Sequence, residues 1–191
     1  GSVDDFFGVT LDVTEDRQRE IKASFRAELL EKLTQLHSPE SIMQLATEQI
    51  GTHFGASRCY LARISLEEQT TDVFHEHHRE GLDSIVGVHS IADFLDAGEL
   101  ASVVAGNPIR IDDMRQSERP SVKIQQFEKL GIVAVAQGSF ESTKNLHRTL
   151  FVSKEHPYSW RDVEIKFLDD LTEMVYLRID RAQALVELEQ A

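Results

Sequence analysis

The sequence predicts an α+β domain: an antiparallel sheet with helices packed on one face, set between long helices near both ends of the chain. Three observations favour this fold class. Apolar residues recur every three or four positions over residues 17–37 and 161–191, which is the period of an amphipathic helix. Strand-like runs flank short polar turns at residues 56–79 and 132–153, which predicts two hairpins. Shorter helical segments lie between the hairpins.

Composition limits the classes of function. The 191 residues suit one domain with extensions. The single cysteine, Cys59, excludes an internal disulfide and a cysteine-based zinc site, and it favours a reducing, cytoplasmic setting. The net charge of −13 argues against binding to nucleic acid or to an anionic membrane surface, because both need clustered Lys and Arg.

The first segment, residues 3–16, contains a run over Phe6–Val13 that predicts a strand, with Asp12 and Thr14 able to cap the next helix. Gly8 to Arg17 resembles the last strand and exit motif of a PAS sensor domain: Gly, a few residues, then Asp-x-Thr-Glu-Arg, with one inserted Asp. The resemblance implies that residues 3–16 are the tail end of an upstream PAS domain.

Residues 17–37 are predicted to form a linker or signalling helix. Its apolar stripe could pack on its own domain or against a second copy in a coiled coil, and the sequence leaves both arrangements open. The members of the stripe are Ile21, Phe25, Leu29, Leu33 and Leu36.

The body of the domain, residues 38–160, begins with a helix that Ser38 caps and Gly55 ends, with Pro39 at its first position. Strands are predicted over 56–65 and 70–79, followed by an irregular segment. The remaining predicted elements are a helix at 99–105, a short strand at 108–111, a helix at 121–129, and strands at 132–140 and 146–153.

Three groups of residues invite a chemical role. Cys59 could be a thioether anchor or redox thiol, but a lone cysteine in an apolar strand is more often a packing residue. His75 and His77 share one strand face, but two imidazoles need further ligands to hold a metal, so we predict no metal site. Adjacent Asp112 and Asp113 are more typical of a turn than of an acid–base pair.

The order of elements from Phe25 to Leu188 resembles the GAF domain, in particular the GAF domains of bacterial sensor kinases and phytochrome-like receptors. The residues that carry the resemblance are Ala105-Gly106-Asn107-Pro108-Ile109 leading to Asp112, then Leu130-Gly131-Ile132-Val133-Ala134, then Pro157 and Trp160. The resemblance implies a pocket between the sheet and the segments holding four residues, which we predict to bind a ligand: Phe94, Ile111, Met114 and Phe127.

The cofactors of that family are compared residue by residue. Phytochrome-type domains place histidines where this chain has Lys123 and Ser153, and the region 118–126 lacks the cysteine that anchors a bilin in cyanobacterial relatives. Of the cyclic-nucleotide signature, only Lys154 and Glu164 agree. We therefore expect neither a covalent bilin nor cyclic GMP, and the ligand stays unknown.

Residues 161–191 are predicted to form a second signalling helix of roughly 45 Å, longer than one small domain needs. This length favours a homodimer with paired terminal helices, although a helix that only covers its own sheet is the alternative. Its stripe consists of Ile165, Leu168, Leu171, Val175, Ile179, Ala182, Leu185 and Leu188.

Together these features predict a non-catalytic sensory module of bacterial signal transduction. It would bind a small ligand, or relay an upstream PAS signal, through a dimeric helical bundle to a C-terminal histidine kinase or diguanylate cyclase. The alternative is a structural dimerisation and relay module without a ligand. An enzyme is the weakest reading, because no nucleophile–base spacing, metal motif or phosphate loop is present.

Overall fold

The computed structural model of the chain describes the backbone of residues 3–142 and 146–191, and the side chains of residues 14–140 and 146–191. The chain divides into two units, Gly1–Leu36 and His37–Ala191, which are described separately.

The first unit contains one uninterrupted helix, α1, from Val3 to Thr34. The strand predicted over Phe6–Val13 is therefore wrong. A strand needs a neighbour for its backbone N–H and C=O groups, and none of the described strands pairs with these residues, whereas a helix bonds the same groups internally. The assignment of residues 3–16 to a PAS domain stays a prediction.

The second unit is built on a sheet, and the predicted α+β class with an antiparallel sheet is confirmed. The described residues form six strands in the order β3-β2-β1-β6-β5-β4, and every neighbouring pair is antiparallel. The central pair, β1 and β6, comes from opposite ends of the unit. The strands are β1 Arg58–Ser65, β2 Thr70–His78, β3 Gly87–Ser90, β4 Arg110–Ile111, β5 Ala134–Ser142 and β6 Leu146–Lys154.

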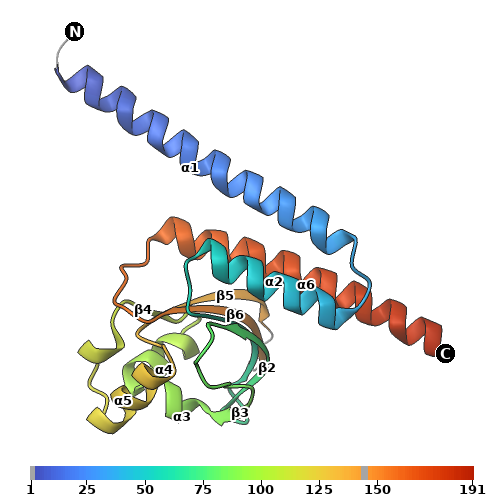
Figure 1. Cartoon of the computed structure of the whole chain (residues 1–191). Helices are drawn as coiled ribbons and strands as arrows, with labels where there is room; N and C mark the ends of the chain where they lie inside the picture. The colour runs from blue at the N-terminus through green and yellow to red at the C-terminus, as the bar shows by residue number, and fades with distance from the viewer. Residues whose placement is uncertain (1–2, 143–145) are drawn as a thin grey trace. The chain divides into compact units, whose positions relative to one another are not determined.

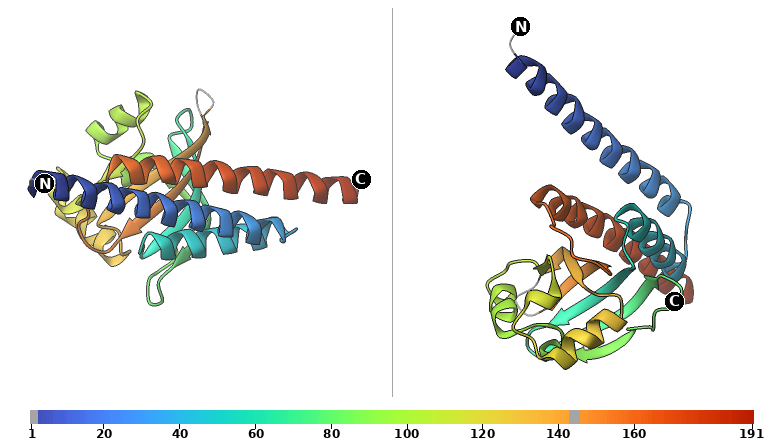
Figure 2. Two further views of the ribbon diagram at one scale, coloured as in Figure 1. Left: turned by 90° about the horizontal axis from the view of Figure 1, so that it is seen from above. Right: turned by 60° about the vertical axis from the view of Figure 1, so that its left-hand side comes forward.

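Helices lie on both sides of this sheet (Figures 1 and 2). The long helices α2, Pro39–His53, and α6, Asp162–Gln190, run side by side over one face. The opposite face carries the short elements α3 Ile91–Phe94, α4 Ala97–Val104, η1 Met114–Gln116 and α5 Ser121–Lys129. Among the helices of the described residues, none combines the length and apolarity that a membrane crossing requires.

Local signals account for the helix starts and the strand faces. Ser38 caps α2 as predicted, because its hydroxyl accepts a hydrogen bond from the Ser41 N–H at 3.3 Å. Alternation in β1 sends Cys59 toward α2, where a β-carbon on Gly51 would lie 3.2 Å from it. Tyr60 and Ile64 point to the other side of the sheet and join its apolar core.

The apolar stripe of α6 is buried along most of its length. The six residues from Ile165 to Ala182 that were predicted to form it are buried. The last two, Leu185 and Leu188, are 48% and 74% exposed. The end of α6 therefore presents an apolar surface that no residue described between 37 and 191 covers.

Candidate functional site

A cavity of about 50 Å³ lies between the sheet and the short helices on the side away from α6. The sheet contributes side chains from β1, β2, β4, β5 and β6. The short helices α3, α4, η1 and α5 and the loops before β4 and β5 and after α3 supply the rest of the wall. On the sheet side the wall consists of Tyr60, Ile64, Thr71, Val73, Ile111, Val135 and Phe151.

The four residues predicted to form a ligand pocket all lie on this wall. Ile111, Met114 and Phe127 are buried, and Phe94 is partly exposed. The rings of Phe94 and Phe127 lie 5.8 Å apart between centroids, so the two aromatic side chains meet across the short helices. That these residues contact a ligand stays a prediction.

The cavity is small and apolar. Its volume of about 50 Å³ is well below the roughly 300–1,000 Å³ that is typical of pockets for drug-sized ligands. No charged side chain among the described residues lines it, and its polar side chains are those of Tyr60 and Thr71. Sequence reasoning missed Tyr60, although its place in a period-two strand beside Ala62 and Ile64 was a usable signal.

Hydrogen bonds and ion pairs hold the segment that contains α3 and α4 over the cavity. The Arg119 guanidinium is buried, donates a hydrogen bond to the Phe94 carbonyl at 2.8 Å and pairs with Glu99. Lys123 donates to the Ala92 carbonyl at 2.8 Å. Glu99 also closes the capping box of α4 with Asp96. These bonds connect the wall to the start of α5.

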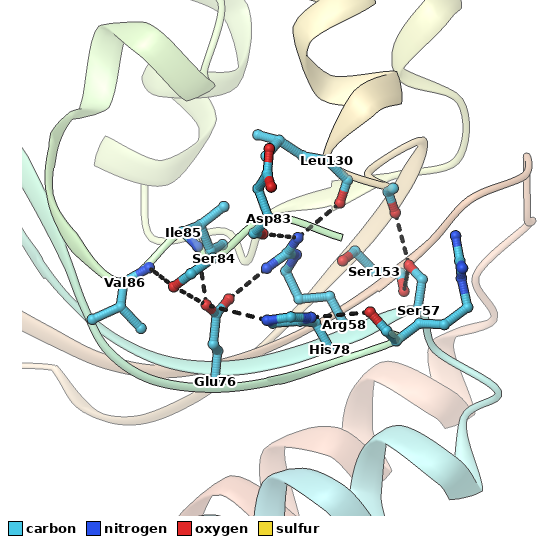
Figure 3. A network of polar contacts seen from close by, with 12 residues as sticks. Ser57, Arg58, Glu76, His78, Asp83, Ser84, Ile85, Val86, Leu130 and Ser153 are labelled. Carbon is cyan, nitrogen blue, oxygen red and sulfur yellow. Dashed lines mark hydrogen bonds and ion pairs between the residues drawn. The ribbon is translucent and has the colours of Figure 1, made fainter. Parts of the chain in front are cut away.

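A second network, shown in Figure 3, fixes the loops at one end of the cavity. The side chains of Arg58 and Glu76 are 0% and 5% exposed and form an ion pair with an N–O distance of 2.5 Å. Arg58 also donates to the carbonyls of Asp83, at 2.7 Å, and Leu130, at 3.0 Å. Glu76 accepts from the Ile85 N–H at 3.0 Å.

Ser57 continues this network toward the far strands. Its hydroxyl lies 2.7 Å from the Gly131 carbonyl and 3.0 Å from the Ser153 carbonyl. The network therefore ties β1, β2 and β6 to the loops at 83–85 and 130–131, directly before the cavity residue Ile132.

The other candidate residues have structural roles in the described part of the chain. Cys59 is buried, and burial raises the pKa of its thiol, which disfavours the reactive thiolate. His75 is buried beneath α2, and burial holds its imidazole pKa below the usual value despite Glu40 at 3.5 Å. No group of three metal-binding side chains occurs among the described residues.

The adjacent aspartates behave as turn residues. Asp112 accepts a hydrogen bond from the Trp160 N–H at 3.2 Å through its carboxylate. Asp113 caps η1 by accepting from the Arg115 N–H at 3.0 Å, and its bonds to Arg115 hold the pKa of the carboxyl below its usual range. Neither faces the cavity, which agrees with the turn interpretation.

Among known proteins, similarity to this chain is found in solved structures. No family model matches the sequence, and no curated protein matches it either. The far-red absorbing dark state of JSC1_58120g3 with bound biliverdin IXa superposes with a TM-score of 0.63 at 17% identity, covering 83% of this chain and 99% of that one.

Two further structures lead to the same fold. The GAF domain of the Acinetobacter phosphoenolpyruvate-protein phosphotransferase gives a TM-score of 0.64 at 12% identity, covering 87% of this chain and 98% of that chain. The chromophore-binding domain of the bacteriophytochrome RpBphP3 from R. palustris gives 0.64 at 13% identity, covering 88% of this chain and 64% of that one.

These neighbours correct the expectation about cofactors. The expectation that a covalent bilin is absent was wrong as an argument about this fold, because one structure of the fold carries biliverdin and another is a chromophore-binding domain. The residues compared in the sequence, Lys123 and Ser153 among them, test particular contacts to the chromophore and not whether the fold can house one. The architecture of residues 37–191, with its sheet order, flanking helices and cavity, is the fold of GAF domains.

Proposed function

We propose that this chain is a non-catalytic sensory GAF module, which binds a small molecule in its cavity and transmits the change through its terminal helices. The observation that carries the proposal is the apolar cavity of about 50 Å³. Well-packed cores hold few voids larger than a water, so a cavity of this size on one side of the sheet needs an explanation. A ligand that fills it supplies one.

In this proposal the chain forms a homodimer through its terminal helices, and these helices transmit the signal. Helix α6 has 29 residues, roughly 44 Å of length, and its last two stripe leucines are exposed. A second copy would cover them, and rotation or a register shift of paired helices would carry the signal. The effector would be a C-terminal histidine kinase or diguanylate cyclase of a bacterial signalling protein, acting after an upstream PAS domain.

The second candidate is a relay without a ligand. The small volume of the cavity favours it, because a core can tolerate a void without using it. The dimer and the helical output would be the same in both cases, so only ligand binding separates them.

Native mass spectrometry of the chain, beside a denatured control and a sample incubated with biliverdin, tests the proposal. We expect two chains plus a small mass that is lost on denaturation. Val103→Phe, which adds a ring to the cavity wall, should lose that mass, whereas Val104→Phe, at the neighbouring and 63% exposed position of α4, should keep it.

Three other results of this experiment would each contradict one part of the proposal. Two bare chains in every sample would favour the relay over the ligand sensor. A bound mass that Val103→Phe does not reduce would place the ligand elsewhere. A bare monomer would contradict the dimer.

A further inference from the structure

Two side chains of the cavity wall, Tyr60 and Thr71, carry hydroxyl groups. Of the three tyrosines in the sequence, two have bonded hydroxyls: Tyr176 donates to the Thr149 carbonyl at 2.7 Å, and Tyr158 donates to Glu164 at 2.5 Å. Tyr60, only 6% exposed, lines the cavity, and its hydroxyl forms no hydrogen bond with any described residue. The Tyr60 hydroxyl is not among the fully enclosed polar atoms that lack a partner in the described residues, so it is open to the cavity, where a water or a ligand can accept its hydrogen bond.

The position of this hydroxyl is fixed by packing. The Tyr60 ring stacks on Phe151 of the neighbouring strand, with centroids 4.9 Å apart and an interplanar angle of 13°. The pair sits at the centre of the sheet, where β1 and β6 meet. The phenol is therefore held in place before any ligand binds, which lowers the entropic cost of a hydrogen bond to it.

The charges near the cavity restrict the ligand. Burial raises the pKa of Tyr60, so its phenol stays neutral and is able to donate. Two buried arginines beside the cavity already have anionic partners: Arg58 pairs with Glu76, and Arg119, which lies 5.8 Å from the centre of the Phe127 ring, pairs with Glu99. An ion placed in a cavity with no charged side chain would lose its hydration without compensation.

We propose, on the basis of the sensory function above, that the cavity takes an uncharged, mostly apolar small molecule whose one hydrogen-bond acceptor binds the Tyr60 hydroxyl. The volume of about 50 Å³ limits the ligand to a small molecule unless α3 and α4 move outward. Thr71, the other hydroxyl-bearing residue of the wall, lies on the adjacent strand and offers a second polar contact.

Methionine methyl groups provide a direct readout. The chain has three methionines: Met114 lines the cavity, whereas Met43 of α2 and Met174 of α6 lie on the other side of the sheet. Protein labelled with ¹³C at the methionine methyls is titrated in NMR with cyclopentanone, with methylenecyclopentane, which has the same shape but no oxygen, and with cyclopentanecarboxylate.

We expect cyclopentanone to shift the Met114 methyl at lower concentration than methylenecyclopentane, and cyclopentanecarboxylate to leave it unchanged. Tyr60→Phe removes only the hydroxyl, so it should weaken cyclopentanone binding about fivefold, the usual effect of one hydrogen bond, and leave methylenecyclopentane binding unchanged. Unshifted Met43 and Met174 signals in the variant show that the fold is intact.

The outcomes separate this inference from the proposed function. Equal binding of the ketone and the alkene, no effect of Tyr60→Phe, or tight binding of the carboxylate would overturn the ligand class, although the cavity would still bind molecules. No shift of Met114 with any of the three probes would overturn both the ligand class and the ligand-sensing function.

Discussion

At the scale of single residues, the feature with the highest desolvation cost is a buried ion pair. Arg58 has a fully buried side chain, and its only described anionic partner within ion-pair distance is Glu76. Burying two charges costs desolvation energy, which the bonds to the Asp83 and Leu130 carbonyls help to offset. The pair is therefore more important for fixing loops than for net stability.

Removing one partner of this buried ion pair should strongly destabilise the fold. Glu76→Ala leaves the Arg58 charge buried without an anion, so we expect the free energy of unfolding to fall by about 3–5 kcal/mol, measured by urea denaturation. Glu155→Ala, which breaks the exposed pair with Arg79, is the matched control and should change little, because water screens that pair. A Glu76→Ala variant as stable as the wild type would mean that Arg58 is not held as described.

At the scale of elements, the contact between α6 and β5 depends on one residue without a side chain. A β-carbon at Gly138 would lie 2.7 Å from the Leu168 carbonyl oxygen and 2.9 Å from the Leu168 Cγ. Backbone cannot move aside as a flexible side chain can, so the helix approaches the strand closely only because this position is glycine.

Gly138→Ala should therefore push α6 off the sheet. We expect it to lower the free energy of unfolding by about 1–3 kcal/mol, the usual cost of overpacking, in a denaturant titration. Gly98→Ala in α4 is the control: its β-carbon would meet only ordinary contacts, at 3.5 Å, and alanine is the better helix former. If both substitutions had the same effect, the close approach of α6 would be refuted.

At the scale of the whole molecule, the exposed end of α6 predicts an assembly. Leu185→Glu combined with Leu188→Glu should convert a dimer of twice 21.7 kDa into a monomer, raising the dissociation constant at least about tenfold, as measured by analytical ultracentrifugation. The control Val122→Glu places the same charge at a 66% exposed position of α5 and should leave the dimer intact.

The thermal midpoint at high dilution should be the same for the double variant and the wild type, because both leucines are already exposed in one chain. A wild-type monomer, or a variant that still dimerises, would show that these two leucines do not form the interface.

Local signals in the sequence determined several elements but missed β3 and α3, which lie in the segment predicted to be irregular. Ser38 and Pro39 mark the start of α2, and α5 has the predicted bounds, because caps and helical periods act within a few residues. The same local reasoning failed at Phe6–Val13, because whether a β-prone run becomes a strand depends on a partner strand that the local sequence does not specify.

Only the tertiary structure decided the features that matter for function. The neighbours β1 and β6 lie more than 80 residues apart along the chain, and their pairing sets Tyr60 against Phe151. The cavity, the unbonded Tyr60 hydroxyl and the enclosed Arg58–Glu76 pair all arise between segments that are distant in sequence. Packing and burial are sums over such distant contacts, whereas periodicity and capping are properties of neighbours, so the sequence determined the elements and the fold determined the site.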